Sequence, residues 1–457
     1  MPITLKVNSM TQQETRGRTR SLNRREWLTG ASLAAGAAFC SQMPSWLPAA
    51  PVTGKKTRVA AIFTEFTYRS HAHVILENFL KPYIFRGELV TPPVEVVSFW
   101  GDQFPDHDMA KQVSEEFNIP LVDSIHEAMT LGGDRLACDA VLSIGEFGQY
   151  PHNSLGQQMY PRKQFFDQII QSMQSCETFV PVFNDKHFSY RWDWSKEMYD
   201  TTRQLQIPFM AGSSVPLAHR KPQLELPEDC EFDELLLIHG GGPDSYDFHA
   251  LETLQSLIEF RRGGETGASH VQCLQGEAVW KAAEDKLWNP ELVEAALRPE
   301  LGDEAKNWKA MLKSPYLMLV YYKDGLVAPL FSVTGNRWAF ACRLKGEADV
   351  QACQFHVGPW RNRNLFKALA RAIQHFFVTK QAPYPIERTL LTTGITEANM
   401  QSRHNNGEKV PTPQLEFSYQ PHDFVEFRED GTSWDILTYD VPQPEGIQPL
   451  GGLNRGG

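Results

Sequence analysis

Short apolar runs alternate with amphipathic stretches through the first half of the chain. Runs such as Val59–Phe63, Val94–Phe99 and Ala140–Ile144 lack polar alternation, which is typical of strands buried on both faces of a parallel sheet. Two further strands are expected at Thr178–Phe183 and Pro208–Ala211. Helical spacing between the runs predicts helices at Ala72–Leu80, Met109–Phe117, Phe165–Met173 and Ser195–Leu205. This alternation predicts right-handed βαβ units and a doubly wound parallel sheet over residues 55–218.

The pattern changes after the proline-rich stretch Pro216–Pro227. Strands are expected at Phe232–His239, Val271–Gln275, Leu317–Tyr322, Val327–Val333 and Arg337–Leu344, and helices at Phe248–Phe260, Leu365–Val378 and Ile386–Ser402. Asp324-Gly325 and Gly335-Asn336 are hairpin dipeptides that favour antiparallel pairing. We therefore predict an α+β domain over residues 219–440, with a largely antiparallel open sheet, and a flexible tail over residues 441–457.

The N-terminal 50 residues have the features of an export signal. Arg24-Arg25 lies within the segment Ser21–Leu28, which looks like a twin-arginine signal, and a small-residue apolar stretch runs from Trp27 to Phe39. This stretch is too short to span a bilayer of about 30 Å as a permanent helix. The alternative is a basic amphipathic anchor that stays in place. We expect a signal and linker over residues 1–50, a periplasmic or otherwise exported protein, and no membrane association once the signal is removed.

Composition limits the partners of the protein. The 457 residues are 42% hydrophobic, so the chain has enough apolar residues for a large core, and the net charge of −11 disfavours an electrostatic nucleic-acid binder. Seven cysteines are dispersed without C-x-x-C spacing, which predicts buried free thiols. A small molecule is therefore the expected partner.

Polar side chains follow the ends of four predicted strands. Carboxyl ends of parallel strands line the ligand crevice of open α/β sheets, so these turns predict a functional crevice. The candidate substrate-binding residues are Glu65, His71, Trp100, Glu146, Asp185 and His187. Lys186 lies among them, and desolvation in such a crevice would bring a lysine toward acid–base chemistry.

The order of several segments resembles the Gfo/Idh/MocA family, which includes glucose–fructose oxidoreductase and inositol dehydrogenase. The similar segments are Asp139–Ile144, Val180–His187, Tyr246–Glu252 and Pro383–Arg388, with Glu397-Ala398, Ser402 and Gly407. The resemblance implies a Rossmann-like domain followed by an α+β substrate and oligomerisation domain. It also implies that Lys186 and His249 are catalytic and that the protein forms a homo-oligomer.

The turn after the first strand departs from this family. Thr64–His71 contains no glycine, and none occurs between Gly54 and Gly87. The family's glycine-rich turn brings the backbone close to the pyrophosphate of a dinucleotide, and Glu65 adds a negative charge there. NAD(P) therefore remains an open expectation. If it binds, Arg69 is the candidate phosphate contact and Asp102 the candidate ribose contact.

Three functions follow from these observations. The first is an exported oxidoreductase-like enzyme that acts on a sugar or polyol. The second is a cofactor-free or metal-assisted carbohydrate lyase, hydrolase or isomerase, and the third is a non-catalytic carbohydrate-binding protein. The metal version would draw ligands from Glu65, His71, Asp102, Glu146 and His187, whose oxygen and imidazole donors suit transition metals. The identity of such a metal is not indicated by the sequence.

Overall fold

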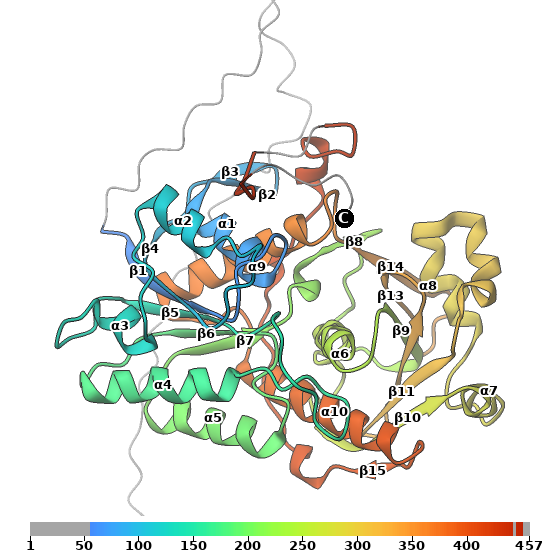
Figure 1. The fold of residues 1–457 in the computed structure, drawn as a ribbon. Helices are drawn as coiled ribbons and strands as arrows, with labels where there is room; N and C mark the ends of the chain where they lie inside the picture. The colour runs from blue at the N-terminus through green and yellow to red at the C-terminus, as the bar shows by residue number, and fades with distance from the viewer. Residues whose placement is uncertain (1–54, 442–444, 451–457) are drawn as a thin grey trace, which may run out of the picture. The chain divides into compact units, whose positions relative to one another are not determined.

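The computed structural model describes residues 55–441 and 445–450, so the predicted export signal lies outside the described residues. Within this part, Figure 1 shows two sheets with helices packed on both. The first sheet is parallel, with strand order β4-β1-β5-β6-β7. Its strands are β1 (Thr57–Phe63), β4 (Val94–Gly101), β5 (Ala140–Ile144), β6 (Val182–Asp185) and β7 (Phe209–Gly212). The predicted doubly wound parallel sheet is confirmed.

The order of the strands places a topological switch point between β1 and β5. The chain leaves β1 for β4 on one side, and an isolated parallel bridge between Phe99 and Leu121 extends the sheet beyond β4. The chain then returns to β5 on the other side of β1, where Phe63 pairs with Ile144. In open α/β sheets, ligands bind outside the strand ends at this point.

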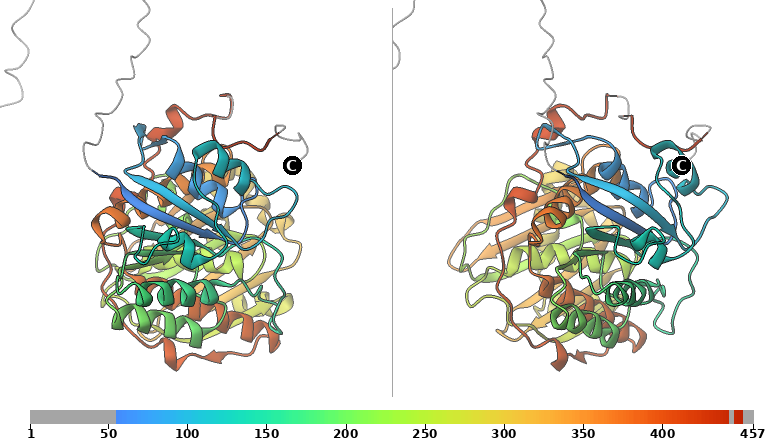
Figure 2. Two further views of the ribbon diagram at one scale, coloured as in Figure 1. Left: turned by 60° about the vertical axis from the view of Figure 1, so that its left-hand side comes forward. Right: turned by 90° about the vertical axis from the view of Figure 1, so that its left-hand side faces the viewer.

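Helices cover both faces of the parallel sheet (Figure 2). One face packs against α1 (His71–Leu80), α2 (Ala110–Phe117) and α9 (Asn362–Thr379). The other packs against α3 (Ile125–Thr130), α4 (Arg162–Ser175) and α5 (Trp192–Gln204). A small hairpin, β2 (Tyr83–Phe85) and β3 (Glu88–Val90), follows α1. Burial on both faces explains why the parallel strands contain consecutive apolar residues.

The second sheet has eight strands in the order β15-β10-β11-β12-β9-β13-β14-β8. They are β8 (His219–Lys221), β9 (Phe232–Gly240), β10 (Ala268–Gln275), β11 (Tyr316–Tyr322), β12 (Val327–Val333), β13 (Trp338–Leu344), β14 (Val350–His356) and β15 (Val410–Pro411). One face packs against α6 (Ser245–Ile258) and α10 (Ile386–His404). The other packs against α7 (Glu277–Glu284), α8 (Glu291–Leu301) and the 3-10 segment Gly302–Met311.

One of the two predicted hairpins is wrong. Asp324-Gly325 does connect the antiparallel pair β11 and β12. Gly335-Asn336 leads from β12 to β13, but these strands do not pair, because β9 lies between them. β9 is parallel to β12 and antiparallel to β13. Its long-range pairing with both strands takes the place of the predicted local pairing between β12 and β13.

The C-terminal part of the chain returns to the parallel sheet. Phe366 and Ile373 of α9 belong to the same core as β1 and α1. Residues 445–450, which the sequence analysis assigned to the tail, also lie at α1. There Ile447 is fully buried, its carbonyl oxygen lies 2.8 Å from His73 Nε2, and its N–H donates to Glu77 at 2.9 Å.

The cysteines in the described residues are all free thiols, as predicted: Cys138, Cys176, Cys230, Cys273, Cys342 and Cys353. Within the same residues, no helix combines the length and the apolar composition that a membrane crossing requires.

Gly240, at the end of β9, packs closely against the turn between β12 and β13, and a substitution can test this packing. A Cβ at Gly240 would overlap the carbonyl oxygen of Gly335, so Gly240→Ala should lower the free energy of unfolding by about 2–3 kcal/mol. Gly242→Ala is the matched control, because nothing lies within 4 Å of its added Cβ. Urea denaturation of both variants measures this difference, and equal stability would contradict the packing described here.

Candidate active site

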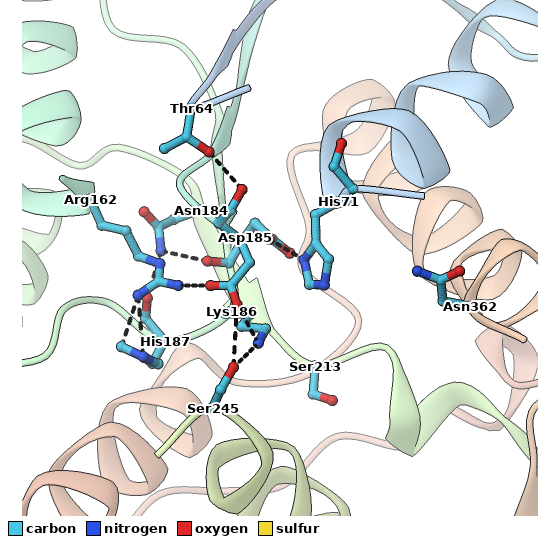
Figure 3. A network of polar contacts seen from close by, with 12 residues as sticks. Thr64, His71, Arg162, Asn184, Asp185, Lys186, His187, Ser213, Ser245 and Asn362 are labelled. Atoms are coloured by element: carbon cyan, nitrogen blue, oxygen red, sulfur yellow. Dashed lines mark hydrogen bonds and ion pairs between the residues drawn. The ribbon is translucent and has the colours of Figure 1, made fainter. Parts of the chain in front are cut away.

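A buried ion cluster lies at the carboxyl ends of β5 and β6. Glu146, directly after β5, accepts a hydrogen bond from Lys186 Nζ at 2.7 Å and is ion-paired with Arg162 at the start of α4. Figure 3 shows Arg162 and Lys186 converging here, together with Ser245 of α6. Lys186 Nζ also donates to Ser245 Oγ at 2.6 Å, so the cluster joins the parallel sheet to the second half of the protein.

Two cations keep Glu146 ionised inside the protein. Burial alone would raise the pKa of this carboxyl, but Lys186 and then Arg162 outweigh burial and hold the pKa well below its ordinary value. Glu146 is 5% exposed and Lys186 is 4% exposed, so water does little to screen the pair. Lys186 uses two of its three N–H groups on Glu146 and Ser245, which leaves the third for a ligand.

His249 approaches the cluster from α6. Its Nδ1 lies 2.6 Å from Ser213 Oγ, and Ser213 itself follows β7. Burial, then the charges of Lys186 and His71, lowers the pKa of His249 well below its ordinary value. His249 is therefore neutral at neutral pH, next to a lysine whose charge is balanced by a carboxylate.

A second pair lies at the start of α1. His71 Nδ1 lies 2.5 Å from Asp185 Oδ2, and both side chains are buried. The His71 ring packs against Phe366 of α9 and against Phe147, with centroid distances of 4.6 and 5.5 Å. Ser70 caps α1 by accepting the N–H of His73, which fixes where the helix begins and thus where His71 points.

Four non-glycine residues around this site have left-handed backbone conformations. Arg69, Phe147, Lys186 and Asp244 all have φ between 63° and 74°, a region that non-glycine residues rarely adopt. Each lies in a turn that presents a residue of the site. Such conformations persist only where the surroundings impose them, and they are frequent at functional sites.

The structure brings six of the predicted site residues into one place. His71, Glu146, Asp185, Lys186, His187 and His249 are all buried, and their contacts or mutual charge effects link them. His187 lies 3.2 Å from Arg162, and burial followed by that guanidinium lowers its pKa well below the ordinary value. His187 is thus a neutral side chain that lines the site.

Four predicted residues lie elsewhere. Trp100 packs edge-on against Phe165 of α4, so it belongs to the helix–sheet core. Asp102 is exposed and accepts a hydrogen bond from Tyr150 at 2.6 Å. Glu65 accepts one from the nearby Thr67 hydroxyl at 2.8 Å, and the Arg69 guanidinium lies over the Tyr68 ring. No described contact joins these four to Lys186 or Glu146.

Three contributing residues were not predicted: Arg162, Ser213 and Ser245. Arg162 follows the polar, glycine- and proline-containing loop 145–161, and such a long loop before a helix is itself a functional signal. Gly145 allows Arg162 to cross the end of β5, because a Cβ at this glycine would meet the Arg162 side chain at 2.7 Å. Ser213 and Ser245 carried no sequence signal beyond their position near strand ends.

The turn between β1 and α1 does not fit a dinucleotide held in the usual way. A glycine-rich turn offers free backbone N–H groups to the pyrophosphate. Here the N–H of Thr64 donates to the Ile144 carbonyl at 3.1 Å, and the N–H of Phe66 donates to Asp108 at 2.6 Å. The Phe66 side chain is fully buried in the core behind the turn. These backbone donors are therefore already used inside the protein.

The rival metal site finds no support in this geometry. Glu146 is paired with two cations, His187 faces Arg162, and Asp102 and Glu65 lie outside the cluster. Among the residues that the structure describes, no three His, Cys, Asp or Glu side chains are grouped as ligands of one metal ion.

Comparisons with known proteins give the class of fold. Neither protein-family models nor curated protein sequences give a match to this chain. GenD2 from gentamicin A biosynthesis, solved in complex with NAD, superposes with a TM-score of 0.52 and 10% identity over 80% of this chain and 99% of its own. A probable dehydrogenase from Thermotoga maritima gives a TM-score of 0.50 and 10% identity over 78% of this chain and 99% of its own.

At this identity the likeness shows the fold and nothing more. The protein has the two-part fold of Gfo/Idh/MocA-type dehydrogenases, a Rossmann-like parallel sheet followed by a mixed sheet with helices. The resemblance found in the sequence is confirmed at this level.

Glu146→Gln should destabilise the protein strongly. It leaves Lys186 and Arg162 buried without their shared carboxylate, which costs about 3–5 kcal/mol. Asp200→Asn is the matched control, since Asp200 pairs with the exposed Lys196 and such surface pairs contribute less than about 1 kcal/mol. Urea denaturation at neutral pH should separate the two variants, and similar losses would contradict a buried cluster.

The loss of stability in Glu146→Gln should also depend on pH. The folded pKa of Glu146 lies below the unfolded value of 4.5, so its stabilisation is present above pH 4.5 and is lost as the pH falls below it. The stability difference between wild type and Glu146→Gln should thus be constant from neutral pH down to about pH 5. This stability difference should become smaller in more acidic solution. A difference that does not change with acid would show that Glu146 is not held ionised.

Proposed function

We propose that this protein is an exported enzyme with an oxidoreductase-like fold that moves protons at a hydroxyl-bearing carbon of a small sugar or polyol. The observation that carries the proposal is the convergence of Lys186 and His249 from the two halves of the fold. Lys186 donates a hydrogen bond to the substrate oxygen, and neutral His249 accepts the proton. His71 and Asp185 orient the substrate beside them.

Aromatic side chains at the edge of the site support a sugar or polyol. Tyr246 is 39% exposed and stacks on Trp338 at 6.0 Å, and both rings lie within 6.5 Å of the His249 ring. Phe147 is 38% exposed next to His71. Exposed rings beside clustered hydrogen-bonding groups offer an apolar surface for the C–H face of a sugar together with partners for its hydroxyls.

Two reactions use this geometry. The fold favours hydride transfer to NAD(P), which would oxidise the hydroxyl that Lys186 and His249 deprotonate. The bonded N–H groups of the β1–α1 turn favour a reaction without a tightly held dinucleotide, such as elimination or isomerisation. We propose the second: His249 takes the proton from the hydroxyl-bearing carbon next to the carbonyl of an open-chain sugar, Lys186 hydrogen-bonds the enolate oxygen that forms, and the proton returns to the neighbouring carbon, so no oxidant is needed.

We also propose that the protein is exported and forms a homo-oligomer. The twin-arginine segment supports export to the periplasm, after which the acidic mature chain would act on a soluble substrate. The resemblance supports a homo-oligomer through the second sheet. Because α7, α8 and the segment 302–311 cover one face of that sheet, an oligomer would use its edges or these helices.

Variants at the two proton-carrying positions test the proposal. The mature protein should be incubated with a panel of monosaccharides and cyclic polyols in D2O, and turnover or deuterium incorporation followed by NMR. Lys186→Met and His249→Asn should each lower the rate about 10²–10⁴-fold. Lys196→Met is the control, because Lys196 pairs with Asp200 at the surface and should keep full activity. If wild type turns over a substrate and both variants turn it over at the same rate, the proposed roles are wrong.

Cofactor use is tested separately. NAD(H) and NADP(H) should be titrated against the mature protein and followed by nicotinamide fluorescence. We expect no saturable binding in the micromolar range, and turnover that does not depend on added dinucleotide. Saturable binding, with formation of a ketone only when NAD(P) is present, would establish hydride transfer in place of the cofactor-free reaction.

A further inference from the structure

A cavity of about 290 Å³ lies at the opposite end of α6 from His249. Ser256 and Leu257 of α6 form one wall, and Phe424 and Val425 of the C-terminal segment form another. Arg220 of β8 and Arg428 also line the cavity. Its volume suits a small molecule, and it shares no lining residue with the site around Lys186.

Two buried arginines in this cavity share one exposed carboxylate. Arg220 and Arg428 are each only 4% exposed. One oxygen of the Glu225 carboxylate accepts a hydrogen bond from Arg220 Nη1 at 3.3 Å, and the other oxygen is ion-paired with Arg428. The Glu225 side chain is 52% exposed and lies in the irregular segment between β8 and β9. Two desolvated positive charges therefore depend on a single counter-ion that lies half in water.

The two guanidiniums also have unused hydrogen-bonding capacity. Within the described residues, each uses only one of its three nitrogens, and the buried Nε atoms of both have no partner. Arg388 is a useful contrast, because both its Nε and its Nη2 donate to the fully buried Glu259. A buried guanidinium normally has such a bidentate carboxylate. Arg220 and Arg428 lack one.

Charge repulsion strengthens this imbalance. Burial, then the charge of Arg428, lowers the pKa of Arg220 to about 10. A carboxylate that pairs with both guanidiniums more completely than Glu225 does would relieve that cost, since buried charges are stable only when paired and hydrogen-bonded.

We propose that the cavity binds a small organic monoanion, whose carboxylate takes the place of the Glu225 carboxylate between Arg220 and Arg428. The apolar part of the ligand would pack against Leu257, Phe260 and Phe424. Glu228 and Asp423, both exposed, line the cavity as well, and these negative charges disfavour a multiply charged ligand. This site would be independent of the chemistry proposed at Lys186.

Benzoate is a suitable probe, with benzyl alcohol as its uncharged analogue and inorganic phosphate as a multiply charged one. Calorimetric titration should give saturable binding of benzoate, and neither benzyl alcohol nor phosphate should bind at the same concentrations. Glu225→Gln removes the competing carboxylate and should tighten benzoate binding about tenfold. Arg428→Gln should abolish it.

Two further variants keep the test decisive. Arg428→Lys retains the charge but loses the guanidinium fork, so it should fold normally by circular dichroism and bind benzoate more weakly than wild type. Lys186→Met should leave benzoate binding unchanged, which separates this cavity from the candidate active site. No saturable binding by wild type and Glu225→Gln, or equal binding by wild type and both Arg428 variants, would overturn the proposal.

Discussion

The candidate site depends on one buried carboxylate with two cations. Glu146 and Arg162 lie at the two ends of the loop between β5 and α4, and Lys186 follows β6, so the cluster fixes two consecutive loops of the parallel sheet. A lysine and an arginine would not be stable this deep without a shared counter-charge. Through Ser245, the same cluster also contacts the first residue of α6, about one helical turn before His249.

The fold is that of the dehydrogenases described above, and several backbone groups of its β1–α1 turn are hydrogen-bonded within the protein. Thr64 donates its hydroxyl hydrogen to the Glu146 carbonyl at 2.6 Å, and its own carbonyl accepts the N–H of Gln103 at 2.7 Å. The turn that contacts a pyrophosphate in dinucleotide-binding folds thus ties together the ends of β1, β4 and β5. A backbone group bonded within the protein is not available to a ligand without a loss in free energy. The scaffold can therefore keep its topology while its chemistry changes.

The sequence predicted the elements better than the contacts between them. Buried runs such as Val59–Phe63 and Ala140–Ile144 identified the parallel strands, because burial on both faces leaves a continuous apolar pattern. The insertion of β9 between β12 and β13 was missed, since hairpin dipeptides report only on neighbours along the chain. The return of α9 to the first sheet also connects segments that are distant in sequence.

For the site, the sequence by itself determined which turns carry polar side chains and that the glycine-rich turn is absent. Those facts depend on residue type and order alone. Only the tertiary structure decided that Glu146 pairs with Lys186 and Arg162, while Trp100 packs in the core and Asp102 faces Tyr150. The physical reason is that strand ends share an edge by topology, but the partner of each charge is selected by burial. A charge near water tolerates many neighbours, whereas one removed from water must be paired.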